Sequence, residues 1–145
     1  MLGYTKLGDP IVIFGSKSGT TYTPATLTDD YTDNTSDTIR VSGVYGISLD
    51  IEYTYGSGET SNKLQLQIEG STDGTNWFQL PNDSTTDGTS TITSRTFEIG
   101  QADSNIHLNI RELLTEYIRI KVQENGVASN YGTVSIELTL WGSNE

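Results

Sequence analysis

Residues 117–140 read YIRIKVQENGVASNYGTVSIELTL. Apolar and polar side chains alternate along this stretch, on both sides of a loop at Asn125 and Gly126. The apolar positions are Ile118, Ile120 and Val122 before the loop, and Val134, Ile136, Leu138 and Leu140 after it. Because successive side chains of a strand point to opposite faces of a sheet, the pattern predicts two strands, each with one buried face.

The same alternation recurs upstream, so most of the chain is expected to form strands. The further strands are expected at residues 38–42, 47–55, 64–68, 76–80, 91–99 and 106–110. Asp73-Gly74 is a tight-turn signal, residues 82–89 read as a loop, and residues 111–116 are expected to form a single helical turn. Many short strands without intervening helices predict an all-β, two-sheet antiparallel sandwich, and jelly-roll and immunoglobulin-like topologies both fit.

Residues 1–37 lack this regular pattern and are expected to form an extended N-terminal arm on a β-sandwich domain of residues 38–145. The arm is rich in Thr, Ser and Asp, and its apolar cluster is Ile11, Val12, Ile13 and Phe14. Such a short cluster can pair as an edge strand or be captured by a neighbouring subunit. These four residues are therefore the candidate interface of the arm.

The composition excludes several classes of function. The 145-residue chain fits one domain. Its formal net charge is -11 and it has 8 Lys and Arg residues, so it lacks the clustered cations that bind nucleic acid. It has no cysteine, which excludes disulfides and zinc–thiolate sites. No apolar run approaches the ~20 residues that span a bilayer, and the first residues do not read as a signal peptide, so we expect no membrane partner.

Catalytic motifs are not apparent in the sequence, and we expect no enzymatic activity. The single histidine, His107, alternates with apolar neighbours and is expected to face solvent without a nucleophile beside it. Four carboxylates also alternate with core positions and are expected to point to solvent, although a cleft on the outer face of one sheet could collect some of them. They are Asp50, Glu52, Glu69 and Glu137.

The arm ends in the acidic run DDYTDNTSD at residues 29–37. Oxygen ligands at this density suit calcium, which takes six to eight of them. The spacing is not that of an EF-hand loop, so a solvated linker is the alternative. We expect no cofactor, and the residues that a calcium ion would use are Asp29, Asp30, Asp33 and Asp37.

Three large aromatic residues are candidates for recognition. Trp77 and Phe78 follow the Asp73-Gly74 turn, and Trp141 ends the last strand. In an alternating strand only one of Trp77 and Phe78 can face the core, which leaves the other for a sheet edge or an interface. Packing in a core or interface and a sugar-stacking platform are both open to these side chains.

Two segments carry a resemblance to a known group of proteins. Residues 71–77, STDGTNW, follow an alternating strand, and residues 117–122 and 132–142 form the closing strands. Over roughly residues 64–142 the chain resembles small β-sandwich structural proteins of tailed-phage virions. The resemblance carries over no functional residue, because such proteins act through surfaces and not through catalytic sites.

The resemblance implies a capsid decoration or auxiliary protein, located in the virion, that stabilises the head. Its expected partners are the major capsid protein or other virion proteins and further copies of itself, with a trimer as the expected homo-oligomer. The arm would be a strap that becomes ordered on assembly. A tail-associated virion protein is one alternative, and a carbohydrate-binding module for host attachment through Trp77 or Trp141 is another.

Overall fold

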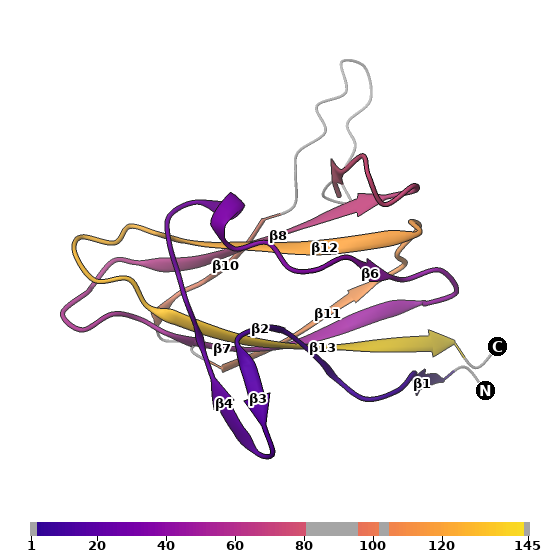
Figure 1. Cartoon of the computed structure of the whole chain (residues 1–145), viewed down its shortest axis with the longest axis horizontal. Helices are drawn as coiled ribbons and strands as arrows, with labels where there is room; N and C mark the ends of the chain where they lie inside the picture. Colours follow the sequence, from indigo (N-terminus) through magenta and orange to yellow (C-terminus); the bar gives the residue numbers. More distant parts are fainter. Residues whose placement is uncertain (1–2, 81–95, 102–104, 144–145) are drawn as a thin grey trace.

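The alternating segments form two antiparallel sheets that pack face to face, which confirms the predicted all-β sandwich (Figure 1). The structure is a computed structural model, and it describes residues 3–80, 96–101 and 105–143. Its elements are β1 (Tyr4–Lys6), β2 (Ile11–Phe14), β3 (Ser16–Ser18), β4 (Thr21–Thr23), β5 (Ala25–Thr26), η1 (Tyr31–Asp33), β6 (Ile39–Arg40), β7 (Gly46–Thr54), β8 (Lys63–Ser71), β9 (Phe78–Gln79), β10 (Thr96–Ile99), β11 (Asn105–Arg111), β12 (Tyr117–Asn125) and β13 (Thr133–Ser143).

Each of the two sheets has a path of four paired strands, with further short strands paired beside it. The first has the order β1–β13–β7–β11, and β2 and β5 also pair with β13. The second has the order β10–β8–β12–β6, and β9 also pairs with β8. The hairpin β3–β4 forms a small sheet of its own and projects outward beside the first sheet (Figure 1).

The order of connections decides between the two topologies that the sequence leaves open. The chain passes from the arm strands in the first sheet to β6 in the second, then to β7 in the first and β8 in the second. After β10 it alternates again, through β11, β12 and β13. After the arm, consecutive described strands lie in the same sheet only from β8 to β10. Immunoglobulin-type sandwiches keep several consecutive strands together, so this order is that of a jelly roll.

The core lies between the sheets and is built from the inward-facing half of each strand. On β7, Leu49 and Ile51 are buried and Asp50 between them is exposed. The buried apolar residues of the four longest strands are Ile47, Leu49, Ile51, Tyr53, Leu64, Leu66, Ile68, Ile118, Ile120, Val122, Val134, Ile136 and Leu138. Burial of apolar surface, worth roughly 25 cal/mol per Å², is the main force that holds the two sheets together.

The N-terminal arm lies along the edges of its own sandwich. β1, β2 and β5 pair in turn with one edge of β13. Phe14 in β2 and Leu27 after β5 are buried in the core, with 7% and 1% of their surface exposed. Residues 28–36 then cross to the second sheet, where main-chain hydrogen bonds join them to β12. The arm therefore covers main-chain groups that an open sheet edge would leave unpaired.

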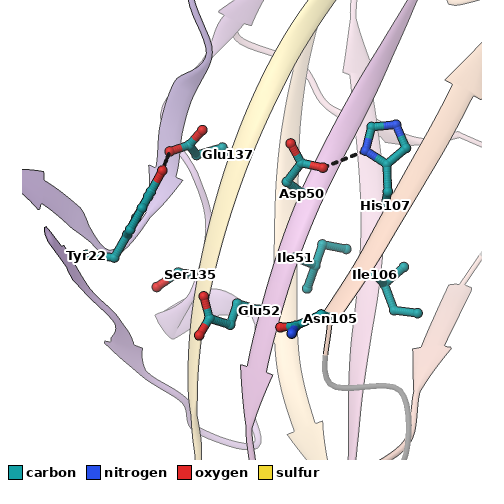
Figure 2. A pocket seen from close by; sticks show the side chains of 9 residues that line it. All are labelled: Tyr22, Asp50, Ile51, Glu52, Asn105, Ile106, His107, Ser135 and Glu137. Atoms are coloured by element: carbon teal, nitrogen blue, oxygen red, sulfur yellow. Dashed lines mark hydrogen bonds and ion pairs between the residues drawn. The ribbon is translucent and has the colours of Figure 1, made fainter. Parts of the chain in front are cut away.

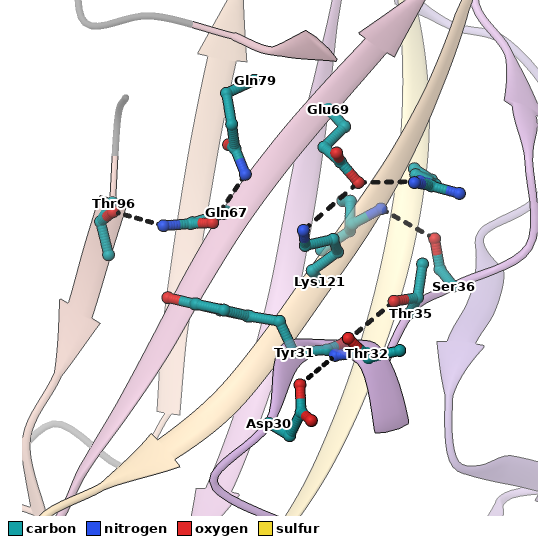
Figure 3. Close-up of polar contacts among 12 residues, drawn as sticks. Asp30, Tyr31, Thr32, Thr35, Ser36, Gln67, Glu69, Gln79, Thr96 and Lys121 are labelled. Carbon is teal, nitrogen blue, oxygen red and sulfur yellow. Dashed lines mark hydrogen bonds and ion pairs between the residues drawn. The ribbon is translucent and has the colours of Figure 1, made fainter. Parts of the chain in front are cut away.

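The crossing between the sheets is fixed by local hydrogen bonds. The Asp30 carboxylate accepts a hydrogen bond from the Thr32 N–H at 2.8 Å and so caps η1. The Ser36 hydroxyl accepts one from the Ile120 N–H of β12 at 2.9 Å. The Lys121 ammonium lies 5.5 Å from the centroid of the Tyr31 ring (Figure 3). These contacts hold the arm against the second sheet.

Two predicted elements differ from the structure. Residues 111–116 do not form a helical turn, because β11 runs to Arg111 and pairs there with Gly46. The chain then bends through Glu112, whose φ is +57°, and buries Leu113. The strand predicted at 76–80 is reduced to β9, whereas the loop at 82–89 and the start of the strand at 91–99 lie outside the described residues. No described helix is long and apolar enough to cross a membrane.

A buried carboxylate joins three parts of the sandwich at one end. Glu124 of β12 is fully buried. Its oxygens accept hydrogen bonds from the Tyr53 hydroxyl, from the Asn62 amide at 2.6 Å and from the Gly132 N–H at 2.6 Å. Burial and the adjacent Glu124 carboxylate raise the pKa of Tyr53 above its ordinary value, so this hydroxyl stays a donor. Three donors replace the water that the carboxylate loses.

Glu59 makes the stability of the fold depend on pH. Its carboxylate accepts hydrogen bonds from the N–H groups of Ala128, Asn130 and Ser129, which lower the pKa of Glu59 from 4.5 to about 2. A lowered pKa stabilises the fold above pH 4.5, and this contribution is lost as the pH falls toward 2. We therefore expect Glu59→Gln to lower the free energy of unfolding more at about pH 7 than at about pH 3. Urea unfolding at both pH values measures this difference, and an equal loss at both would contradict the assignment.

Candidate functional site

Polar side chains gather on the outer face of the first sheet, where β13, β7 and β11 lie side by side. The register places Glu137 opposite Asp50, and Asp50 opposite His107, in one row across the three strands. Glu52 is two residues beyond Asp50 on β7, and it pairs with Asn105 of β11. These residues line a hollow of about 400 Å³ (Figure 2).

The β3–β4 hairpin forms one wall of this hollow. The Tyr22 hydroxyl donates a hydrogen bond to the Glu137 carboxylate, and the Lys17 ammonium lies 3.4 Å from the same carboxylate (Figure 2 shows the Tyr22 contact). The hydrogen bond with Tyr22 and the charge of Glu137 raise the pKa of Lys17, which keeps it charged. Gly19, with φ +62°, makes the tight turn of the hairpin. Side-chain contacts therefore tie the hairpin to the face of the sheet.

A second hollow, of about 280 Å³, adjoins the first and is rich in aromatic rings. Tyr4, Tyr45 and Trp141 line it, and the Tyr4 and Tyr45 rings stack with centroids 5.0 Å apart. The indole N–H of Trp141 donates to the Ser48 hydroxyl at 2.8 Å. His107 lines both hollows. We call the two together the outer groove, with an aromatic end at Trp141 and an acidic end at Glu52.

The outer groove has the general form of a ligand site, because it is concave and combines aromatic rings with a few convergent polar groups. No family model matches this chain, and no curated protein matches it. What the groove can do therefore follows from its own side chains.

The groove does not bring the Ser135 hydroxyl to the His107 imidazole. Ser135 is on β13 and His107 is on β11, and β7 lies between them, so their strands are roughly 9–10 Å apart. A catalytic serine and histidine need a direct hydrogen bond. The Nδ1 atom of His107 instead bonds to Asp50, and the two side chains are 56% and 58% exposed. The imidazole of His107 is therefore bonded to a carboxylate and not to a hydroxyl.

Three of the four carboxylates predicted to face solvent lie in the outer groove, so the cleft that the sequence leaves open is present. The three are Asp50, Glu52 and Glu137. The prediction is wrong for Glu69, which is only 7% exposed on the second sheet. Arg119 and Lys121 of β12 lie 2.8 and 3.5 Å from its Oε1 atom, and these two cations replace the hydration that the buried carboxylate loses (Figure 3 shows the Lys121 contact).

Of the three predicted aromatic candidates, only Trp141 lies in the outer groove. Trp77 is next to the second sheet, where the Arg119 guanidinium lies 4.5 Å from its ring centroid in a cation–π contact. Phe78 is 70% exposed in β9, and neither residue belongs to the core. Trp77 and Trp141 therefore belong to different sheets and do not form one platform.

The four candidate interface residues of the arm differ in accessibility. Ile11 is 43% exposed, Val12 and Ile13 are half-buried, and Phe14 is buried in the core of its own chain. The cluster pairs with β13 as an edge strand, with a bulge between Ile136 and Glu137. Ile11 is the member of the cluster most open to a neighbouring molecule.

The acidic run is engaged in local structure. Asp30 caps η1, and the Asp33 carboxylate accepts a hydrogen bond from the Thr28 hydroxyl at 3.1 Å. Within residues 3–80, 96–101 and 105–143, no group of three or more acidic, His or Cys side chains is arranged to hold a metal ion. The calcium candidates Asp29, Asp30, Asp33 and Asp37 thus gain no geometric support from the described residues.

The turn that carries the resemblance is a local hydrogen-bonded unit. The Asp73 carboxylate accepts hydrogen bonds from the N–H groups of Asn76 and Thr75, both at 2.8 Å, which lower the pKa of Asp73. The Ser71 hydroxyl accepts one from the Gly74 N–H at 2.9 Å, and Gly74 has φ +76°. The residue types of the motif are explained by the turn itself.

Tyr4, Tyr22 and Tyr45 belong to the outer groove but are not among the residues predicted from the sequence. Tyr4 and Tyr22 lie in the arm, where no regular alternation marks them. The one local signal is Gly19 between the segments SKS and TYT, which is typical of a short hairpin. Their approach to β7 and β13 depends on the tertiary fold.

Proposed function

We propose that this chain is a non-enzymatic structural protein of a virus particle, of the capsid decoration type, which stabilises the head by adding contacts between subunits. The observation that carries the proposal is the exposed apolar side chains of Leu7 and Ile11 in the arm. They are 41% and 43% exposed. Both lie along the edge of β13, since the Leu7 N–H donates to the Leu140 carbonyl and Ile11 pairs with Leu138.

A hollow beside Ile11 would receive a side chain from a partner. It measures about 310 Å³, and among the residues that line it are Ile11, Ile13, Ile39 and Leu140. Exposed apolar side chains beside such a hollow are characteristic of protein contacts. The expected partners are the major capsid protein or another virion protein, together with further copies of this chain as a homo-oligomer, for which a trimer is our preferred state.

Two further features favour this function. Jelly rolls are common among viral capsid proteins. The strongly acidic chain, with a net charge of -11, suits a protein that binds a protein shell and stays clear of nucleic acid. A tail-associated virion protein would use the same surfaces, and its position in the particle distinguishes it.

The proposal is tested on purified particles of the virus whose genome encodes the chain. Quantitative mass spectrometry is expected to find many copies per particle, and cryo-electron microscopy is expected to place them on the head. Absence of the chain from purified particles would reject a virion function, whereas density on the tail would move the proposal to the tail-associated alternative.

The arm contact is tested by Ile11→Asp. A buried charge without a partner at an interface costs several kcal/mol, so we expect occupancy on particles to fall at least about tenfold. The variant is expected to keep the thermal midpoint within a few degrees, because Ile11 is already exposed. Tyr55→Asp is the matched control, since Tyr55 is also 43% exposed but follows the end of β7, six residues beyond Leu49, which lies level with Ile11 across β13. Full occupancy of Ile11→Asp, or equal loss in the control, would contradict the arm contact.

A further inference from the structure

We propose that the outer groove binds a neutral oligosaccharide. The groove follows β7 from Gly46, at its aromatic end, to Glu52, at its acidic end. At ~3.3 Å per residue this span is roughly 20 Å, which is longer than a single sugar ring. The inference does not depend on where the protein resides, so it stands or falls separately from the virion function.

The aromatic end offers fixed ring surfaces. Trp141 is paired across the sheet with Gly46, which has no side chain, so the indole can extend over β7 to Ser48. The hydrogen bond to Ser48 satisfies the indole N–H and fixes the direction of the ring. Tyr4 and Tyr45 stack beside it, and Tyr4 is 50% exposed. Rings held in this way provide the flat apolar surfaces on which the C–H faces of sugars pack.

The remainder of the groove offers hydrogen-bonding groups that no other described residue satisfies. The side chains of Asn109, Asn105 and Glu52 are exposed and make no hydrogen bond or ion pair with another described residue. An amide both donates and accepts, and a carboxylate accepts at two oxygens. Sugar hydroxyls also donate and accept, so this set matches them in kind.

The charges of the groove favour a neutral ligand. The net charge of -11 repels sugars that carry carboxylate or sulfate groups, and the lining itself opposes Glu52 at the acidic end with Arg111 at the aromatic end. A cationic peptide is the main rival ligand. However, Asp50 is already bonded to His107 and Glu137 to Lys17, which leaves Glu52 as the unpaired carboxylate of the described lining. One free carboxylate is weak recognition for a polycation.

The test is titration calorimetry on the isolated full-length protein. The probes are neutral hexose oligosaccharides of increasing length, with sulfated and uronic-acid oligosaccharides and a Lys-rich peptide for comparison. We expect binding of the neutral set, with affinity that rises with length until the groove is filled. No neutral binding by the folded protein, or a preference for either charged class, would overturn the proposal and would leave the virion function untouched.

Variants on the two sheets locate the site. Trp141→Ala is expected to weaken neutral binding by at least about tenfold, the scale of one lost aromatic contact. Asn109→Ala and Glu52→Ala are expected to weaken it several-fold, and both positions are exposed, so these variants test the groove without disturbing the core. Trp77→Ala, on the second sheet, is the matched control and is expected to bind normally. Equal losses in Trp77→Ala, or full affinity in all three groove variants, would exclude the outer groove.

Discussion

A protein that starts at Thr38 is expected to lose its cooperative fold. The deletion removes Phe14 and Leu27 from the core and leaves one edge of β13 unpaired. Truncation of a buried Leu or Phe costs about 2–5 kcal/mol, and a domain has about 5–15 kcal/mol in total. Thermal unfolding followed by circular dichroism is expected to show no sigmoidal transition, and amide signals in NMR spectra are expected to be poorly dispersed.

A shorter deletion provides the control. A protein that starts at Leu7 loses only β1, whose three residues are exposed, and is expected to unfold cooperatively with a midpoint lowered by no more than about 5 °C. A cooperative transition for the Thr38 protein would contradict the role of the arm in its own core. If the Thr38 protein lacks a cooperative fold as expected, a change in its oligomeric state does not report on whether the arm joins subunits. Point variants such as Ile11→Asp are then the proper test of the arm at an interface.

Much of the sandwich could be predicted because its central strands bury one face each. In β12 the alternation of residue types reports directly which side chains are buried. In β7 and β13 it marks the inner face, but Ser48, Ser135 and Thr139 of the outer face are buried too. The strands of the arm carry no such signal, because β1 and β5 are held by main-chain pairing with β13. Leu27 is a single apolar residue without a periodic neighbour, so its burial depends on the path of the arm.

The groove could be predicted only in part, for a related reason. Alternation correctly places Asp50, His107 and Glu137 on outer faces, and it leaves open which strands are neighbours. The pairing of β7 with both β11 and β13 brings the three into one row, and strand order does not follow from a residue pattern. Glu69 has the same local pattern as Asp50 but is buried, because cations of β12 lie beside it.

Glu124→Ala is expected to lower the free energy of unfolding by about 3–5 kcal/mol, one of the largest effects of a single substitution in this chain. The substitution removes the shared acceptor of the Tyr53 hydroxyl, the Asn62 amide and the Gly132 N–H. The Tyr53 hydroxyl and the Gly132 N–H stay buried without an acceptor, at about 1–3 kcal/mol apiece, whereas the Asn62 amide keeps its hydrogen bond to the Tyr53 hydroxyl. Urea unfolding measures the loss. The slope of unfolding free energy against urea concentration is held common to all variants.

Two matched variants separate the loss of the acceptor from a general effect of mutating β12. Glu124→Gln keeps one oxygen in the same shape, so it can still accept from Tyr53 and Asn62 or from Gly132 but not from all three, and an intermediate loss is expected. Asn125→Ala alters the next, exposed residue and is expected to change stability by no more than about 0.5 kcal/mol. If Glu124→Ala and Asn125→Ala lose equal stability, then solvent satisfies the three donors and the carboxylate does not clamp the strands together.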